Sequence, residues 1–200
     1  MFVAIAVIIG AYLVGSVASA ILVCRAMGLP DPRQEGSRNP GATNVLRVGT
    51  RTAAELTLAG DFLKGWLPVA IAVALGTPAP VVAAAGLAAF LGHVFPVFFG
   101  FHGGKGVATG LGVLLGWSWL ALLAAALTWV AVAAAFRYSS LAALVAFLLA
   151  PIYLLGLGEP PLVIAAMAVV TALTFWRHQG NIRNLRQGTE KRIGEKAGSA

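Results

Sequence analysis

The charged residues of this 200-residue chain gather in two basic clusters, and long apolar runs separate them. One cluster, residues 25–51, holds five arginines and two acidic residues, and the other, residues 177–200, holds six basic and two acidic residues. Only 10% of the chain is charged, against about 25% of a typical soluble domain. Because so few charges cannot form the polar shell of a soluble protein, the sequence predicts an integral membrane protein.

The net charge of +7 has two candidate explanations, nucleic acid binding and membrane orientation. A nucleic-acid-binding protein needs a soluble domain to carry its basic patch. Here the basic clusters flank apolar runs, so the positive-inside rule accounts for them better. We therefore expect no nucleic acid partner. The 59% hydrophobic content also excludes disorder.

The chain has a single cysteine, Cys24, which excludes a disulfide framework and a thiol metal site. We interpret Cys24 as a small apolar residue at a helix end, and we expect neither a metal nor a cofactor. The first 24 residues lack a basic n-region and a cleavage site, so we interpret them as a retained span rather than a signal peptide.

A membrane-spanning helix needs about 20 mostly apolar residues. The stretch 107–136 is too long for one span, and Trp117-Ser118 breaks it, so we divide it into a short helix and a full one. The predicted segments of this all-α fold are 2–24, 53–76, 81–101, 107–116, 119–136, 140–156 and 160–176. A ten-residue helix rises only about 15 Å. The short segment must therefore begin or end inside the protein.

Seven segments place both basic clusters on the cytoplasmic side, with the N-terminus outside and the C-terminus inside. The outer turns then carry one charged residue, Glu159. We expect residues 1–200 to form one membrane-embedded domain. The tail residues interpreted only as positive-inside anchors are Arg186, Lys191, Arg192 and Lys196.

A turn rich in glycine, asparagine and hydroxyl groups follows the first span. It reads Gly36-Ser37-Arg38-Asn39-Pro40-Gly41-Ala42-Thr43-Asn44-Val45, and Arg47 comes next. Such backbone can present N–H groups to an anion, and an arginine can grip phosphate with two donors. The same residues also fit an ordinary inter-helix loop. From composition alone both interpretations stay open.

A second polar segment opens the predicted short helix. It reads His102-Gly103-Gly104-Lys105-Gly106-Val107-Ala108-Thr109. Glycines allow close approach of a ligand, a helix N-terminus favours negative charge, and Lys105 adds a cation. The segment predicts phosphate binding in preference to a solvated turn. Because it lacks the full Walker A pattern and a preceding strand, we exclude nucleotide hydrolysis.

Three polar residues lie inside apolar spans. Asp61 and Lys64 are three positions apart on one helix face, so they either form a structural ion pair or belong to a site. His93 is a lone helix histidine, which is more often structural than a base. Intramembrane charges are costly, so each of these residues needs an explanation.

Taken together, these motifs resemble the bacterial acyl-phosphate:glycerol-3-phosphate acyltransferases, the PlsY family. The resemblance rests on the 36–47 turn, Asp61 to Gly65, Gly92-His93 with Pro96, the 103–109 segment and the tail from His178 to Glu190. It runs from Gly15-Ser16 to the tail. Two positions depart from the family pattern, His102, where Lys or Arg is usual, and Arg38, where the family varies.

The resemblance implies transfer of a fatty acyl group from acyl phosphate to the 1-hydroxyl of glycerol 3-phosphate. The product is lysophosphatidate, in phospholipid biosynthesis. It also implies a seven-helix inner-membrane protein with a cytoplasmic site, in contact with membrane lipids and functionally linked to the enzyme that makes acyl phosphate. The H-x-x-x-x-D motif of other glycerol-phosphate acyltransferases is absent.

On this resemblance we assign site roles. The predicted catalytic residues are His178, Asn181 and Lys105. The predicted substrate- or phosphate-binding residues are Ser37, Asn39, Arg47, Lys64, Gly103, Gly104, Lys105, Gly106, His93 and Ser140, with Ser139 as a weaker candidate. Glu190 is expected to brace the tail against nearby arginines. The acyl chain is expected between helices, in the cavity that the short helix leaves open.

Two other functions remain candidates. A phosphate or organophosphate transporter is the principal alternative, and it predicts paired broken helices in both halves of the chain. A non-catalytic membrane scaffold is the other, but it leaves the clustered Gly, Asn, Ser and Lys residues unexplained. The departing phosphate can itself take the proton, so a dedicated base is not required by our hypothesis.

Overall fold

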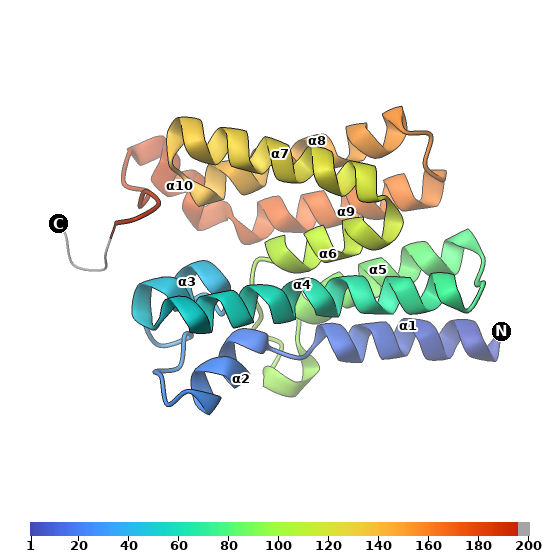
Figure 1. Ribbon diagram of the computed structural model, residues 1–200, viewed down its shortest axis with the longest axis horizontal. Helices are drawn as coiled ribbons and strands as arrows, with labels where there is room; N and C mark the ends of the chain where they lie inside the picture. The colour runs from blue at the N-terminus through green and yellow to red at the C-terminus, as the bar shows by residue number, and fades with distance from the viewer. Residues whose placement is uncertain (196–200) are drawn as a thin grey trace.

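The computed structural model describes residues 1–195, and within them the chain forms ten α-helices, one 3-10 helix and no strand (Figure 1). The all-α prediction is therefore confirmed. The elements are α1 (Phe2–Gly15), α2 (Ser19–Ala26), α3 (Ala42–Val48), α4 (Arg51–Ala74), α5 (Ala79–Val94), η1 (Val97–Phe99), α6 (Val107–Trp117), α7 (Trp119–Phe136), α8 (Ser139–Gly156), α9 (Pro161–Arg177) and α10 (Gln179–Gln187).

Apolar helices long enough to span a membrane make up most of the fold. Four segments qualify by length and hydropathy: α4, α5 continued through η1, α7 and α8. Two bent pairs, α1 with α2 and α9 with α10, raise the number to six, with bends of 46° and 57°. α6 has 11 residues and is about 17 Å long, so it crosses only part of a bilayer. A count of seven spans includes α6 and stays a prediction.

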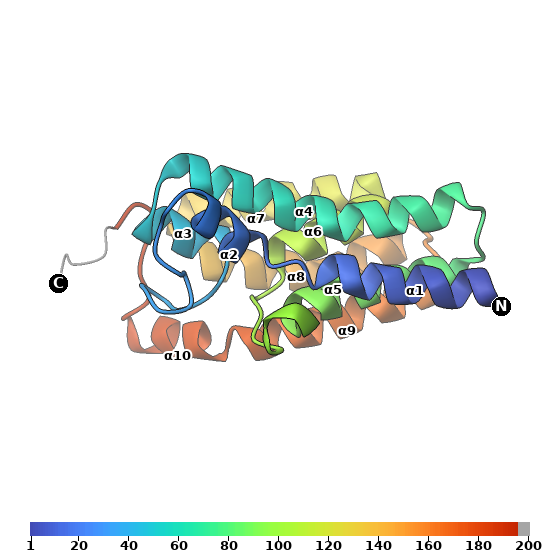
Figure 2. The same ribbon diagram turned by 90° about the horizontal axis from the view of Figure 1, so that it is seen from below.

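The long helices run side by side along the longest axis of the molecule (Figures 1 and 2). Helices α1, α4 and α5 pack together, α7, α8 and α9 form a second group, and α6 lies between the groups. The basic cluster 25–51 and the described part of the other cluster, residues 177–195, lie at the end that carries α3 and α10, and the N-terminus lies at the other end (Figure 1). The two clusters thus lie at the same end of the molecule, as the charge pattern predicted. The assignment of this end to the cytoplasmic side stays a prediction.

The first predicted span, 2–24, is wrong as a single helix. α1 ends at Gly15, and α2 begins at Ser19 after a short break. Lys64 of α4 donates a hydrogen bond from Nζ to the carbonyl of Val17 in this break, at 2.7 Å. The break therefore exposes a backbone acceptor that a distant helix satisfies, which is how an interrupted helix is tolerated inside a membrane.

Close helix packing depends on glycines in this fold. A Cβ on Gly15 would overlap the backbone of Ala89, where α1 meets α5. A Cβ on Gly65 of α4 would overlap the backbone of Thr109, at the start of α6. Small residues let membrane helices approach closely without a hydrophobic driving force between them. The Gly65 contact fixes the depth of the α6 N-terminus against α4.

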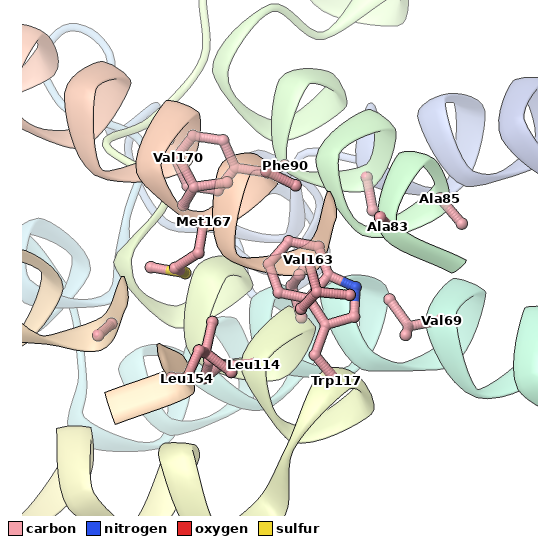
Figure 3. Close-up of a cluster of buried hydrophobic side chains, with 14 of the residues drawn as sticks. Val69, Ala83, Ala85, Phe90, Leu114, Trp117, Leu154, Val163, Met167 and Val170 are labelled. Atoms are coloured by element: carbon pink, nitrogen blue, oxygen red, sulfur yellow. The ribbon is translucent and has the colours of Figure 1, made fainter. Parts of the chain in front are cut away.

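A buried apolar cluster joins the two helix groups through α6 (Figure 3). Phe90 of α5 and Met167 of α9 are fully buried in it, together with Leu114 of α6 and Leu154 of α8. Trp117 closes α6, and its indole N–H donates to the carbonyl of Val82 at 3.2 Å. This packing holds α6 rigidly between its neighbours, so its first turn is a fixed platform.

Candidate active site

A cavity of about 300 Å³ lies at the N-terminal end of α6, toward the basic end of the molecule. Segments far apart in the sequence line it: the 37–47 turn with α3, the start of α6, the start of α8, and α10. It gathers most of the predicted site residues. Those that line it are Ser37, Asn39, Arg47, His93, Lys105, Gly106, Ser139, Ser140, His178 and Asn181.

The first turn of α6 faces this cavity. Gly106 caps the helix with a positive φ of 81°, and a Cβ there would also overlap the ring of Phe90. The amide of Gly110 donates to the carbonyl of Gly106 at 2.7 Å, so the amides of residues 107–109 precede the first intrahelical bond. Val107 and Ala108 line the cavity. Free amides and a positive helix end therefore face the cavity, and this arrangement favours negative charge there.

A hydrogen-bonded chain fixes Lys105 at the cavity wall. Its Nζ donates to Oδ1 of Asn181 at 2.5 Å, and Nδ2 of Asn181 donates to Glu190 at 2.6 Å. The Ser140 hydroxyl donates to the same Glu190 oxygen at 2.7 Å, and Asn184 donates to the other at 3.3 Å. The Asn181 amide is thereby held with its oxygen toward the cation. Glu190 does brace the tail, but through amides and a hydroxyl rather than the arginines we expected.

Lys105 is largely buried, and this changes its acidity. Burial lowers the pKa of Lys105 to about 8, the charge of Glu190 opposes this, and the positive charges of Arg47 and Arg177 add to the lowering. The same positive charges favour a bound anion. Lys105 is therefore mostly protonated near neutral pH, and it loses its proton as the pH rises through about 8.

His178 lies at the junction between α9 and α10 and is almost fully buried. Its Nδ1 is 2.7 Å from the carbonyl of Thr174, which can only accept, so Nδ1 carries the proton. Burial, with the nearby positive charge of Lys105, lowers the pKa of His178 to about 4. The imidazole is neutral at pH 7, and Nε2 is left as an acceptor.

The 36–47 turn is held in shape by Asn44, a buried residue to which the sequence assigned no role. Its Nδ2 donates to the carbonyls of Pro32 and Glu35, and its Oδ1 accepts from the amide of Ser37 at 2.8 Å. Ser37 is thus fixed at the cavity wall. Arg47 follows on α3 and lines the same wall.

Three residues that we predicted to bind phosphate, Lys64, Gly103 and Gly104, do not line this cavity. Lys64 does not line the cavity; its Nζ lies 2.8 Å from Oδ1 of Asp61 and bonds Val17, so its charge is used inside the bundle. Gly103 and Gly104 do not line it either. The amide of Gly104 donates to the carbonyl of His93 at 3.2 Å, and His93 fills the space beside its Cα. The Gly104 amide is thus already bonded within the protein.

Arg177 is a site-supporting residue that sequence reasoning missed, because it fits the positive-inside pattern. Its guanidinium donates to the carbonyl of Gly103 at 2.6 Å and to that of Gly104 at 3.1 Å. It also stacks over Trp176. Arg177 thus ties the end of α9 to the loop that carries Lys105. His102, by contrast, is exposed and does not line the cavity, so its departure from the family pattern touches no cavity contact.

One side of the cavity is apolar. It is lined by Leu58 of α4, Leu111 of α6, Trp129 of α7 and Ala143 of α8. The cavity therefore joins a cationic wall to a hydrocarbon-compatible wall. Within residues 1–195, no three His, Cys, Asp or Glu side chains gather as a metal site would require.

Comparison with known proteins shows the family of this chain. A family model described as glycerol-3-phosphate acyltransferase matches residues 5–188. The chain belongs to this family. It is 65% identical to glycerol-3-phosphate acyltransferase of Halorhodospira halophila over 191 residues, 95% of this chain and 96% of that one. It is 58% identical to the protein of that name from Methylococcus capsulatus over 187 residues, 93% of this chain and 94% of that one.

Solved structures agree with the sequence relatives. The fold matches the crystal structure of PlsY (YgiH), an integral membrane glycerol 3-phosphate acyltransferase, in its glycerol 3-phosphate form, with a TM-score of 0.91, 42% identity and 96% of both chains covered. The lysophosphatidic acid form gives a TM-score of 0.89 at 41% identity, covering 96% of this chain and 95% of that one. The glycerol-3-phosphate acyltransferase resemblance and the all-α membrane fold are therefore confirmed, and the transporter alternative loses its support.

Proposed function

We propose that this protein transfers a fatty acyl group from acyl phosphate to the 1-hydroxyl of glycerol 3-phosphate, giving lysophosphatidate and inorganic phosphate. The observation that carries the proposal is one cavity with a cationic wall, at Arg47, Lys105 and the α6 N-terminus, and an apolar wall, at Leu111 and Trp129. Two phosphate-bearing substrates need the first wall, and a fatty acyl chain needs the second.

The reaction requires the protein to neutralise two phosphate groups and to align a hydroxyl with the acyl carbonyl, more than it requires proton transfer by a side chain. The 1-hydroxyl oxygen forms a bond to the acyl carbonyl carbon, and the bond from that carbon to the phosphate oxygen breaks. The hydroxyl proton passes to the departing phosphate, so no dedicated base is needed. Because both substrates are anions that repel each other, Arg47, Lys105 and the free α6 amides do the main work by holding them together.

We assign supporting roles to the residues around Lys105. Ser37 donates its hydroxyl to a phosphate oxygen, and Asn39 lies on the same wall. Asn181 positions the Lys105 ammonium group through its 2.5 Å hydrogen bond. Neutral His178 offers an acceptor at Nε2, which suits a substrate hydroxyl better than a phosphate. In this scheme His178 orients the acceptor substrate and does not supply a charge.

The acyl chain lies along the apolar wall in our proposal. Leu58 projects from α4, and Trp129 projects from α7 on the other side of α6. α4 and α7 extend past the start of α6 toward the end of the molecule that carries α3 and α10 (Figure 1). The cavity lies at this start of α6, between residues of α4, α6 and α7. The acyl carbonyl then meets the polar wall at the first turn of α6.

The basic end of the molecule, which carries this cavity, is proposed to face the cytoplasm of a bacterial inner membrane. Glycerol 3-phosphate would reach the cavity from water, and acyl phosphate from the membrane surface. The enzyme that makes acyl phosphate is then a functional partner, and the membrane lipids surround the apolar faces of the bundle.

The proposal is tested by assaying lysophosphatidate formation by the purified protein in detergent. Glycerol 3-phosphate is the acceptor, and acyl phosphate, acyl-CoA and acyl carrier protein thioester are compared as donors. We expect product with acyl phosphate only. Comparable rates with either thioester would contradict the donor assignment, and no product with any donor would contradict the activity itself.

A further inference from the structure

Two carboxylates line the cavity, and they differ in their bonding. Glu190 accepts hydrogen bonds from Ser140, Asn181 and Asn184, so its oxygens are occupied. Asp61 of α4 has no such set of donors. A carboxylate beside a phosphate site repels the phosphate, so the presence of Asp61 on the wall calls for a different ligand group.

Asp61 is held inside the bundle by an ion pair. It is 3% exposed, and Nζ of Lys64 lies 2.8 Å from its Oδ1. Lys64 is itself anchored to the Val17 carbonyl at the α1–α2 break. The carboxylate is therefore held by a lysine that does not itself line the cavity. In residues 1–195, no hydrogen bond other than this contact with Lys64 occupies the carboxylate.

His93 of α5 shares this part of the wall. It is 6% exposed, and its Nδ1 lies 3.7 Å from Oδ1 of Asp61, too far for a hydrogen bond. Among the described residues Nδ1 has no hydrogen-bond partner. Its ring packs against Gly104, next to Lys105 in the loop. Two buried polar groups with unused bonding capacity therefore face the cavity close to the cationic site.

The chemistry of these groups selects the ligand atoms that they can bind. An ionised carboxylate only accepts hydrogen bonds, and an imidazole can accept one and donate one. A substrate phosphate is drawn to the cations Arg47 and Lys105. In glycerol 3-phosphate the remaining donors are the two hydroxyls. The 1-hydroxyl, which His178 orients in the proposed scheme, must reach the acyl carbonyl, and this leaves the 2-hydroxyl for Asp61 and His93.

We infer that Asp61, positioned by Lys64 and assisted by His93, forms a subsite that binds the 2-hydroxyl of the acceptor. This subsite selects glycerol 3-phosphate over phosphate monoesters that lack the hydroxyl. The inference rests on the proposed function. A site that hydrogen-bonds a substrate hydroxyl rejects the analogue without it, because its buried polar groups are then left unpaired. One charge-assisted hydrogen bond corresponds to about 10- to 100-fold in kcat/KM.

The test compares two acceptors in the acyl phosphate assay, glycerol 3-phosphate and propane-1,3-diol monophosphate. The second keeps the phosphate and a primary hydroxyl but lacks the 2-hydroxyl. For the wild type we expect kcat/KM to favour glycerol 3-phosphate by about 10- to 100-fold. Equal values with the two acceptors would overturn the subsite while leaving the proposed function intact. No transfer to either acceptor would contradict the proposed function, and the subsite with it.

Variants of Asp61, Lys64 and His93 test whether these residues cause the preference for glycerol 3-phosphate. Asp61→Leu combined with Lys64→Met removes both charges together, which avoids an unpaired buried cation. We expect the preference to fall to within about threefold, because only the rate with glycerol 3-phosphate drops. His93→Gln, a single neutral change, should reduce the preference in the same direction. The matched control is Glu55→Gln, which breaks an exposed ion pair to Arg51 on the same helix and should leave both rates unchanged.

A merely structural role for the ion pair predicts a different pattern. The rates with both acceptors would then fall together, and their ratio would stay at the wild-type value. That result, in a variant that keeps its melting temperature or in His93→Gln, would overturn the inference. If the double variant fails to fold, the wild-type ratio and the His93→Gln ratio still decide the question.

Discussion

The buried position of Lys105 makes the activity depend on pH above neutrality. Its pKa is lowered to about 8, so in the free protein the side chain is about 90% protonated at pH 7 and about 10% protonated at pH 9. The charged form is present below this pKa and is lost as pH rises through it. If the ammonium group must be charged to bind phosphate, kcat/KM for glycerol 3-phosphate falls about tenfold between pH 7 and pH 9.

The charge of the substrate phosphates does not change over the pH range in which Lys105 loses its proton. A phosphate monoester has its second pKa near 6, so the substrates are fully ionised above pH 7.5. A bound phosphate stabilises the charged lysine, so the fall should appear in kcat/KM, which reports the free enzyme, before it appears in kcat. The assay is initial-rate lysophosphatidate formation at subsaturating glycerol 3-phosphate, from pH 6.5 to pH 9.5.

The comparison variant is Lys105→Arg, which keeps its charge throughout this range. We expect its absolute rate to be lower, because guanidinium geometry differs from that of an ammonium group, but its kcat/KM to be flat from pH 7 to pH 9. A wild-type profile that stays flat to pH 9.5 would refute the reasoning. A fall of equal size in Lys105→Arg would refute it too, since the titrating group would then lie elsewhere.

Three further predictions address other parts of the site. Ser37→Ala and Arg47→Ala should each lower kcat/KM about 100-fold in the same assay, since each removes a phosphate contact; near-wild-type rates in both would remove the anion site from this wall. Arg177→Met leaves two carbonyls of the loop before α6 without their donor, so both the melting temperature and the rate should fall, and an unchanged melting temperature would contradict this. Trp129→Ala enlarges the cavity beside its apolar wall and should shift the donor preference toward longer acyl chains. An unchanged preference would contradict the proposed position of the acyl chain along this wall.

The extent of the apolar helices follows directly from the sequence. The boundaries of α7 agree with the predicted 119–136, and α6 ends within one residue of the predicted 107–116. Hydropathy specifies these segments because each must bury apolar side chains in lipid or in the bundle. The short polar helices α3 and α10 were not predicted, since they lie in loops where hydropathy carries no signal.

The α1–α2 break and the fate of Lys64 could not be derived from local sequence. Whether the chain breaks near Val17 depends on a donor 47 residues away in α4. The sequence left open whether Asp61 and Lys64 form a structural ion pair or belong to a site, and the structure shows the pair. The sequence does not indicate which carbonyl accepts a hydrogen bond from Lys64. The partner of a buried polar group is set by tertiary packing, and a single sequence does not record it.

The candidate site was predictable at the level of its residues and less so in its contacts. Ser37, Arg47, Lys105, His178 and Asn181 were singled out, and the structure places all five around one cavity. The tail motif that carries Glu190 was recognised, but its partners were assigned to arginines because charge pairing is the simplest assumption. Arg177 was overlooked for the opposite reason, since orientation in the membrane already explained it. The Lys196 anchor assignment lies outside the described residues.

The central claim is that anionic substrates meet at the α6 N-terminus and exchange an acyl group there. It is tested most directly by measuring both products of the purified protein given acyl phosphate and glycerol 3-phosphate. We predict equal amounts of lysophosphatidate and inorganic phosphate, with both lost together in Lys105→Ala. Phosphate release without lysophosphatidate, or full product formation by Lys105→Ala, would contradict it.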